Sequence, residues 1–508
     1  MGVVAKQSIK GTLMSYMGVA VGLVTTFFVM TKYLTAEEIG LTRVLADAAI
    51  LLSGLSQMGT ATSAIRYYPF FKDEKRRDHG FFGWTLIVPL VGFVVFTALF
   101  FAFKPALIAY FSKNSALFVD YMYFVIPMAF FMVYLVVFET NSNLLMRIVF
   151  PRFVREVGIR TFTLIDYILY IIGVINLDGM VIGLCAAYVL ATLLNIIYLL
   201  SLKKISFKIE PSYVDKKIRN DFLKYTLIMI ISSVITTIVP MLNSFMISAK
   251  MGLMFTGIYK IANDMAALVE MPYRALGSIS KPAVSQAMKD NNMTAVQSLT
   301  KDVALHQLMA GLVVFFIIWI NIDLFFSVLP NGDVYDVGKW VFFILVIAKL
   351  INTSLNIGVT VMSYSKYYYI QLFFTATLTT IAIIFNNVFI PKFGMVGSAL
   401  ASLCSFSIYY ILILSVIAWK SKVHPFSWNM LKLLAIMVSL FVINWLSVRY
   451  LSSMLFSAFG NGIVVKFIEA LFRTLILCGL GLTAIYKMKI SKQVNELIDR
   501  ALKKIWRK

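Results

Sequence analysis

The sequence predicts an all-α polytopic membrane protein with about fourteen transmembrane helices, and three observations support this. Of the 508 residues, 60% are hydrophobic and only 14% are charged, whereas a soluble globular chain carries about 25% charged residues. Apolar stretches of 18 or more residues recur along the chain, and each is long enough to cross a bilayer as a helix. Ten-residue alternating strands, which are typical of membrane β-barrels, do not occur in the sequence.

The predicted helices follow one another from the N-terminus, separated by short polar or glycine-containing stretches. The fifth and sixth are separated only by a tight turn signal, Asn176 to Gly179, so we expect them to form a helical hairpin. The predicted spans are 11–34, 39–65, 81–103, 117–140, 153–176, 178–201, 222–248, 254–280, 303–328, 337–360, 366–390, 394–419, 430–450 and 463–487.

Two spans open with the same charged signature, G-x-x-[R/K]-x-x-x-D, about 217 residues apart. Its two copies are Gly40, Arg43, Asp47 and Gly257, Lys260, Asp264. The glycine-rich openings of the sixth and twelfth spans, at Gly179 and Gly394, recur at a similar distance of about 215 residues. Both matches predict a six-helix duplication, with the two halves related by a pseudo-two-fold axis along the membrane normal.

The duplication divides the chain into lobes and appendages. We predict an N-lobe at 1–202, a basic cytoplasmic linker at 203–221, a C-lobe at 222–420, two extra helices at 421–488 and a basic amphipathic cytoplasmic tail at 489–508. Because one chain contains both lobes, a monomer is sufficient for function.

The formal net charge of +22 mainly reflects how the loops are placed on the two sides of the membrane. Most Lys and Arg residues fall in loops on one side of the membrane, and the positive-inside rule places that side, with both termini, in the cytoplasm. We expect the basic surface to contact anionic lipids of the inner leaflet. Nucleic-acid binding would require a basic soluble surface with base-reading elements, which the sequence does not contain.

The sequence offers no recognisable catalytic or cofactor motif. It has no P-loop and no H-E-x-x-H pair, and it contains only three histidines and three cysteines. We therefore predict no metal, no cofactor and no enzymatic activity. The longest external loop, Asn321 to Gly338, is too short for a soluble catalytic face. The remaining functional class is a transporter, driven by an ion gradient, the membrane potential or downhill flow.

Charged residues inside the predicted spans are the main functional candidates, because each costs about 2.5–3.5 kcal/mol at mid-bilayer on insertion scales. Lys349 lies deep in the tenth span and Asp166 deep in the fifth, and neither has an evident partner nearby in the sequence. Arg160 has Glu156 four residues before it, and Arg473 has Glu469 in the same relation. Such i, i+4 pairs can neutralise each other on one helix face.

A purely structural interpretation competes with a functional one at several positions. Arg43 and Lys260 lie near the outer ends of their spans, where long side chains can reach the interface. Arg66, at the cytoplasmic end of the second span, is explained equally well as a positive-inside anchor. Pro240 lies inside the seventh span and is a candidate hinge, because proline interrupts the helical hydrogen-bond ladder.

The region from Tyr33 to Tyr68 resembles a known family. The stretch YLTAEEIG, the small-residue run with Gly59, and Ile65-Arg66-Tyr67-Tyr68 resemble the start of bacterial oligosaccharide flippases. These are the Wzx-type exporters in the polysaccharide branch of the MATE-like multidrug/oligosaccharidyl-lipid/polysaccharide superfamily. The resemblance covers the whole chain in length and number of spans.

The resemblance implies a two-lobed bundle with a central cavity in the bacterial inner membrane. Such a protein turns an undecaprenyl-diphosphate-linked oligosaccharide to the outer leaflet, for lipopolysaccharide O-antigen or capsule synthesis. Cavity cations would contact the diphosphate, and cavity carboxylates would bind H⁺ or Na⁺. The candidate cations are Lys349, Arg160, Lys260, Arg43 and Arg66, and the candidate ion-coupling residues are Asp166, Asp264 and Asp47.

Three alternatives remain open from the sequence. A MATE-like cation or drug antiporter would share the fold but should favour carboxylates and aromatic residues over intramembrane cations. A peptidoglycan-precursor flippase would also have fourteen spans. A membrane glycan polymerase or ligase would be an enzyme and would need a larger external loop or soluble catalytic face. Transfer of an undecaprenyl-linked glycan between leaflets is expected of a flippase, but not of the antiporter or the polymerase.

Overall fold

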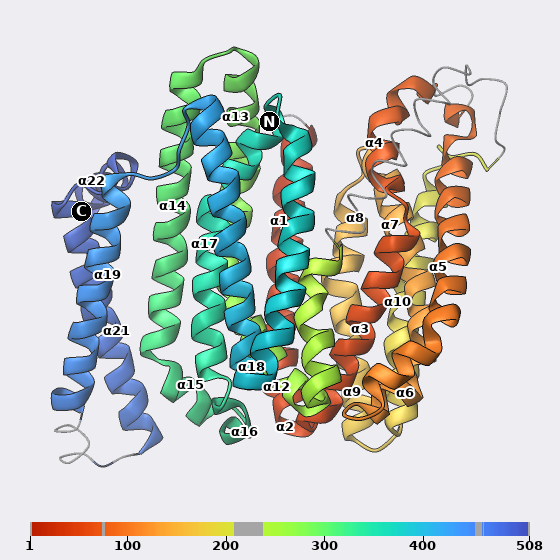
Figure 1. The fold of residues 1–508 in the computed structure, drawn as a ribbon, viewed down its shortest axis with the longest axis horizontal. Helices are drawn as coiled ribbons and strands as arrows, with labels where there is room; N and C mark the ends of the chain where they lie inside the picture. The colour runs from red at the N-terminus through yellow and green to blue at the C-terminus, as the bar shows by residue number, and fades with distance from the viewer. Residues whose placement is uncertain (1–2, 74–76, 208–236, 453–459, 461, 506–508) are drawn as a thin grey trace. The chain divides into compact units, whose positions relative to one another are not determined.

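A computed structural model of the chain describes residues 3–73, 77–207, 237–452, 460 and 462–505 (Figure 1). Helices are the regular structure throughout these ranges, and no strand occurs in them. Nine of the described helices are long and apolar enough to cross a membrane, and one of them, Tyr369–Ser421, is long enough for two crossings. The all-α membrane class is confirmed, whereas the count of fourteen stays a prediction.

The chain forms two compact units. The first contains Met1–Ile261 and Asn386–Gly394, and the second contains Ala262–Phe385 and Met395–Lys508. The first unit therefore includes two segments, 237–261 and 386–394, that the duplication assigns to the C-lobe. The lobe boundaries stay a prediction. Most of the predicted linker and the start of the seventh span, 208–236, lie outside the described residues.

Apart from Asn386–Gly394, the first unit is built from the red to yellow-green helices of Figure 1. They are α1 (Val3–Val24), η1 (Thr25–Met30), α2 (Thr31–Tyr33), α3 (Ala36–Ser56), α4 (Thr60–Phe71), η2 (Arg77–Gly80), α5 (Phe81–Phe111), α6 (Ala116–Tyr121), η3 (Met122–Phe124), α7 (Val125–Leu144), α8 (Val149–Phe153), η4 (Val154–Gly158), α9 (Ile159–Ile171), α10 (Leu177–Ser201), helical residues 237–251 and most of α12 (Leu253–Ala267).

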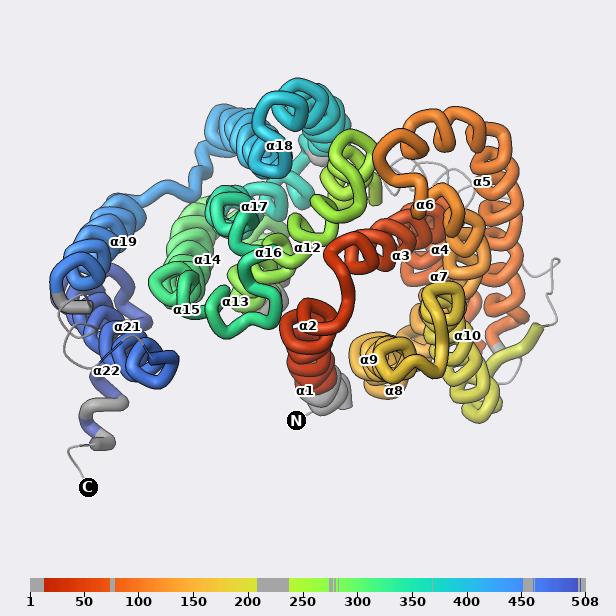
Figure 2. The backbone as a smooth tube through the Cα atoms, turned by 90° about the horizontal axis from the view of Figure 1, so that it is seen from below, coloured from red at the N-terminus to blue at the C-terminus, as the bar shows by residue number. Residues whose placement is uncertain are grey.

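In the second unit, α14 packs beside α17, and α13 contacts both, as Figure 2 also shows. Its elements are the end of α12, η6 (Leu268–Glu270), α13 (Met271–Lys289), α14 (Met293–Ile320), α15 (Ile322–Val328), α16 (Gly332–Asp336), α17 (Lys339–Tyr364), α18 (Tyr368–Ser421) apart from Asn386–Gly394, α19 (Trp428–Ser447), η7 (Val448–Ser452), α21 (Ile463–Lys487) and α22 (Lys492–Ile505).

Several predicted spans are interrupted. The second is split into α3 and α4 at Met58 and Gly59, which have positive φ of 47° and 69°. The first and fifth contain the π-helical turns η1 and η4, and the eighth contains the 3₁₀ turn η6. The eleventh and twelfth run on as α18, broken at Gly394 (φ 57°, ψ −138°). Hydropathy averaged over a window does not reveal such single-turn changes.

Small residues bring α1 close to the start of the predicted fifth span. A Cβ atom at Gly18 would lie 2.3 Å from the carbonyl oxygen of Glu156, and one at Gly22 would lie 2.7 Å from Nη1 of Arg160. These two glycines form a G-x-x-x-G pattern, which allows helix backbones to approach closely in a membrane. The contact positions η4 and α9 beside α1.

The predicted hairpin of α9 and α10 is confirmed. Asn176 caps α10, because its side-chain oxygen accepts a hydrogen bond from the backbone N–H of Gly179 at 2.9 Å. The cap satisfies one of the free N–H groups of the first helical turn. Most of the predicted tail forms the helix α22, which ends at Ile505, and residues 506–508 lie outside the described ranges.

Candidate functional site

The stretch YLTAEEIG starts helix α3 with a capping box. The N–H of Glu38 donates to Oγ1 of Thr35 at 3.2 Å, and the N–H of Thr35 donates to Oε2 of Glu38 at 2.8 Å. This reciprocal arrangement fixes where the helix begins. The hydroxyl of Tyr170 on α9 also donates to Glu38. The stretch that carries the family resemblance therefore sets the position of the first charged signature.

The glycines of the two signatures lie against each other within the first unit. A Cβ atom at Gly40 would lie 2.0 Å from the carbonyl oxygen of Leu253, and one at Gly257 would lie 2.0 Å from that of Ala36. The Gly257 position is also 3.1 Å from the backbone nitrogen of Gly40. Helices α3 and α12 are thus in direct backbone contact, and both positions require glycine. We call this contact, with its charged residues Asp47 and Lys260, the α3–α12 junction.

An ion pair joins the two copies of the signature at this junction. Nζ of Lys260 lies 2.6 Å from Oδ2 of Asp47, and the two side chains are only 12% and 10% exposed. The acid of the first copy is therefore paired with the base of the second. Arg43 donates from Nη2 to Oγ1 of Thr26, in the π-helical turn η1, at 3.0 Å. Both candidate cations thus have specific partners.

Hydrogen bonds extend the contact beyond the signatures. Oγ of Ser115, before α6, donates to the carbonyl oxygen of Ser248 at 2.7 Å, and Nδ2 of Asn114 donates to that of Ala249 at 2.8 Å. Nζ of Lys250 donates to Oδ1 of Asn387 at 2.7 Å. These bonds explain why 237–261 and 386–394 form one compact unit with the N-terminal helices.

Asp166 is buried in the first unit without a hydrogen bond to one of its oxygens. The side chain is 6% exposed, and no described residue provides a hydrogen-bond donor to Oδ2. A Cβ atom at Gly183 on α10 would lie 1.7 Å from Oδ1, so this glycine makes room for the carboxyl group. Burying a carboxyl oxygen without a donor costs free energy, so Asp166 stays a functional candidate.

Arg160 lies on the same helix, nearer its start. Its Nη2 is 3.7 Å from Oε2 of Glu156, with side-chain exposures of 37% and 28%, and it also donates to the carbonyl oxygen of Gly18. The predicted i, i+4 pair is therefore present. Its partial exposure and the backbone contact indicate that Arg160 supports the packing of α1 as well as carrying charge.

Lys349 lies within the second unit, about 15 Å along α17 from its first residue at 1.5 Å per residue. Its Nζ is 3.3 Å from Oε1 of Glu270, with side-chain exposures of 16% and 20%. Glu270 is not among the functional candidates that the sequence indicates. A signal was present, because Glu270 is an acidic residue within an apolar stretch and precedes Pro272 by two positions.

Lys349 shares one face of α17 with two amides. Asn352 and Asn356 follow it at three and seven residues, a spacing that places all three on one side of a helix. The hydroxyl of Tyr410 donates to Oδ1 of Asn352 at 2.7 Å, and that of Tyr273 donates to Oδ1 of Asn356 at 2.6 Å. Nδ2 of Asn356 donates to the Tyr410 hydroxyl at 3.3 Å. The face is therefore polar and internally ordered.

The remaining predicted residues are less informative. Arg66 is exposed on α4, and its guanidinium lies 5.7 Å from the centroid of the adjacent Tyr67 ring. Pro240 is exposed within helical residues 237–251. Asp264 lies in the last turns of α12, within the second unit. Within the described ranges, no group of three or more His, Cys, Asp and Glu side chains is arranged to hold a metal ion.

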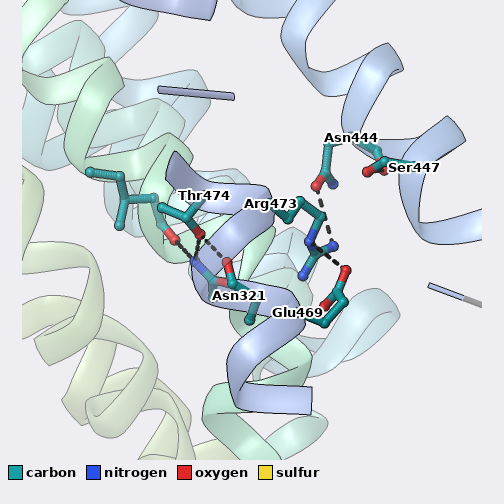
Figure 3. Close-up of polar contacts among 8 residues, drawn as sticks. Asn321, Asn444, Ser447, Glu469, Arg473 and Thr474 are labelled. Carbon is teal, nitrogen blue, oxygen red and sulfur yellow. Dashed lines mark hydrogen bonds and ion pairs between the residues drawn. The ribbon is translucent and has the colours of Figure 1, made fainter. Parts of the chain in front are cut away.

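Helix α21 is joined to α19 and to the end of α14 by the polar contacts of Figure 3. Nε of Arg473 is 3.2 Å from Oε1 of Glu469, and its Nη1 donates to Oδ1 of Asn444 on α19 at 3.3 Å. Nδ2 of Asn321, after α14, donates to Oγ1 of Thr474 at 2.9 Å. Through these contacts Arg473, which is paired with Glu469, and Thr474 brace α21 against α19 and α14. Arg473 also borders an apolar groove of about 900 Å³ lined by α14, α17 and α19.

The sequence profile of a family described as polysaccharide biosynthesis protein matches residues 5–288, which is more than half of the chain. The chain belongs to this family. The match includes both signatures, Asp166 and Glu270, and it ends before Lys349. No curated protein sequence matched the chain significantly.

Solved structures share the fold of this polysaccharide biosynthesis family member. The lipid II flippase MurJ, in an inward closed conformation, has a TM-score of 0.71 at 13% identity, covering 95% of this chain and 100% of that one. An inward-facing multidrug resistance MATE transporter of the MOP superfamily has a TM-score of 0.62 at 15% identity, covering 82% and 99%. A MOP superfamily transporter from Pyrococcus furiosus, described by a reverse polarity of its binding pocket, has a TM-score of 0.54 at 16% identity, covering 82% and 95%.

The chain therefore belongs to the polysaccharide biosynthesis family and shares its fold with these flippase and transporter structures. The predicted resemblance to polysaccharide exporters is confirmed at this level. The chain is a multi-pass membrane protein, as its composition predicts.

Proposed function

We propose that the protein turns an undecaprenyl-diphosphate-linked oligosaccharide from the inner to the outer leaflet of the bacterial inner membrane. This step would serve the synthesis of a surface polysaccharide such as lipopolysaccharide O-antigen or capsule. The observation that carries the proposal is Lys349, a cation placed deep on the polar face of α17 in a chain of the polysaccharide biosynthesis family.

The chemistry of this face suits such a substrate. A lysine ammonium is a compact charge with three donors, and it binds phosphate strongly where water is partly excluded. The amides and tyrosine hydroxyls beside it can exchange hydrogen bonds with sugar hydroxyls. Lys349 and the neighbouring Asn352 thus combine the two kinds of group that a diphosphate-linked glycan needs.

The α3–α12 junction supplies a closed gate in this proposal. Alternating access requires that one end of the transporter closes while the other opens. Backbone contact at Gly40 and Gly257, with the Lys260–Asp47 pair, holds segments of the two predicted lobes together. We place this junction at the outer side, with Pro240 as a hinge, both termini in the cytoplasm and the basic helix α22 on anionic inner-leaflet lipids.

Coupling to an ion gradient is assigned to Asp166. A buried carboxyl group beside Gly183, without a donor to Oδ2 among the described residues, can gain and lose a proton at modest structural cost. A sodium ion would need several oxygen ligands, so a proton is the better candidate. Asp47 and Asp264 are secondary candidates, and Asp47 already neutralises Lys260.

A cation or drug antiporter is the second candidate. It is favoured by the buried Asp166 and by the similarity of the fold to MATE transporters. Deep cations such as Lys349 count against it, because they repel a cationic drug.

Reconstitution distinguishes the two functions. The full chain is placed in liposomes that contain a fluorescent undecaprenyl-diphosphate oligosaccharide, and the fraction reaching the opposite leaflet is measured with a membrane-impermeant quencher. Protein-dependent crossing supports the flippase. Crossing at the rate of protein-free liposomes, together with protein-dependent transport of ethidium, would replace it with the antiporter.

A further inference from the structure

We propose that Glu270 is an internal counter-ion of Lys349 that the diphosphate of the substrate replaces in each transport cycle. Glu270 would then set how tightly the anion is held. The inference rests on the proposed function, because it requires an anionic lipid at Lys349. It adds a specificity-determining residue in η6 that is distinct from the cation itself.

The geometry of the Lys349–Glu270 pair allows exchange. The two charged atoms are 3.3 Å apart and the side chains are 16% and 20% exposed. The Lys260–Asp47 pair is shorter, at 2.6 Å, and more deeply buried. Within the described part of the chain, Glu270 is the only ion-pair partner of Lys349. An ammonium group can donate three hydrogen bonds, so it has capacity for a further anion.

Glu270 lies at a break in the regular helical hydrogen bonding. Glu270 ends the 3₁₀ turn η6, and Pro272 in the first turn of α13 has no N–H to donate. Val269, in the same turn, is 1% exposed, and its Cγ1 would lie 3.3 Å from a Cβ atom at Gly311 on α14. The turn is thus held by Val269, while Glu270 is presented to α17 at a break between helices.

The rest of the polar face does not depend on Glu270. Asn352 and Asn356 are hydrogen-bonded to the hydroxyls of Tyr410 and Tyr273. When Glu270 moves away from Lys349, the amides therefore stay in place and the ammonium group of Lys349 becomes available at a defined position. This separates the pair from a structural brace such as Arg473–Glu469, in which the arginine also bonds to Asn444 on another helix.

Charge provides the reason for exchange. A partly buried cation without a counter-charge is costly, and Glu270 removes that cost while no substrate is bound. A diphosphate carries more negative charge than one carboxylate and therefore competes successfully for Lys349. When the lipid leaves, Glu270 returns to the ammonium group, which favours release. Exchange keeps Lys349 neutralised in both states and prevents the anion from binding too tightly.

Binding of farnesyl diphosphate to the purified full chain tests the inference, with farnesol as the uncharged control. Glu270→Gln should bind the probe about tenfold more tightly, equivalent to about 1.4 kcal/mol, while glycan crossing in liposomes becomes slower. Lys349→Gln should lose the preference for the diphosphate, and the double variant should bind as weakly as Lys349→Gln. Glu469→Gln, which breaks the brace, should leave probe affinity unchanged.

The possible failures are distinguishable. Unchanged or weaker binding by folded Glu270→Gln, with Lys349-dependent binding in the wild type, would overturn this inference alone. A wild type that does not prefer farnesyl diphosphate to farnesol would overturn the proposed function as well. If Glu270→Gln does not fold, Glu270→Asp replaces it. This variant keeps the charge but shortens the side chain, and an affinity no higher than that of the wild type would contradict the exchange.

Discussion

Two partly buried lysine–carboxylate pairs lie in different surroundings in this protein. Lys260–Asp47 sits beside two glycine contacts in which a Cβ atom would lie 2.0 Å from a facing carbonyl oxygen. Lys349–Glu270 is longer and more exposed, and its carboxylate lies on a 3₁₀ turn at a helix break. The first pair is held by the backbone around it, whereas the second can separate while its surroundings remain ordered.

The difference teaches that burial of a charge does not by itself identify a binding residue. A tight pair between packed helices stabilises one arrangement, and breaking it leaves an uncompensated charge. A looser pair beside hydrogen-bonding amides can exchange its partner. Lys260 is therefore assigned to closure of the α3–α12 junction, and Lys349 is assigned to the substrate.

The largest effect is expected at Lys260. Lys260→Met should lower the free energy of unfolding by about 3–5 kcal/mol, because Asp47 is left buried without a counter-charge. Thermal unfolding of the purified protein measures the effect. Lys260→Met with Asp47→Asn should recover most of the loss, and Lys349→Met is the matched control with a smaller change. Equal destabilisation by the two methionine variants would remove the distinction between the pairs.

A smaller loss is expected at the glycine contact. Gly257→Ala should destabilise the protein by about 1–3 kcal/mol, because the added methyl group displaces α12 from α3. Gly479 on α21 is the control, since a Cβ atom there has no neighbour within 4 Å, and Gly479→Ala should be neutral or slightly stabilising. Thermal melting curves of the two variants, recorded in parallel with the wild type, measure the difference. Identical behaviour of the two variants would mean that the backbone contact does not hold the junction.

The smallest stability effect is expected at Asp166. Asp166→Asn should change the free energy of unfolding by less than about 1 kcal/mol, because it replaces a carboxyl group that lacks a donor to Oδ2 with a group of the same shape. Crossing driven by a proton gradient should fall to the rate without a gradient. Liposomes with and without an imposed gradient provide the comparison. A variant that still responds fully to the gradient would exclude Asp166 from coupling.

Much of the fold could be predicted from the sequence because membrane helices are set by composition and length. The hairpin at Asn176 and the repeated signature were also predictable from local residues. The helix breaks at Gly59 and Glu270 were not, because one turn of altered backbone does not change hydropathy averaged over a span. Gly394 could be recognised as the start of a span, but not that it joins two helical segments directly.

The candidate site could be predicted only in part. Lys349 and Asp166 were recognisable because charges inside apolar spans are costly wherever they lie. Their surroundings depend on contacts between distant segments. The pairing of Lys349 with Glu270 joins residues 79 positions apart, and that of Lys260 with Asp47 joins residues 213 positions apart. Spacing along the chain does not indicate this partner for Lys260, which the structure pairs with the other copy of the signature.

Transport by Lys349 variants in liposomes tests the central claim most directly. Glycan crossing should fall at least about tenfold in Lys349→Ala, because a phosphate contact is lost, and it should be largely retained in Lys349→Arg. Both variants should melt close to the wild type. Wild-type crossing by a folded Lys349→Ala would contradict the assignment of this lysine to the substrate and leave it a structural role alone.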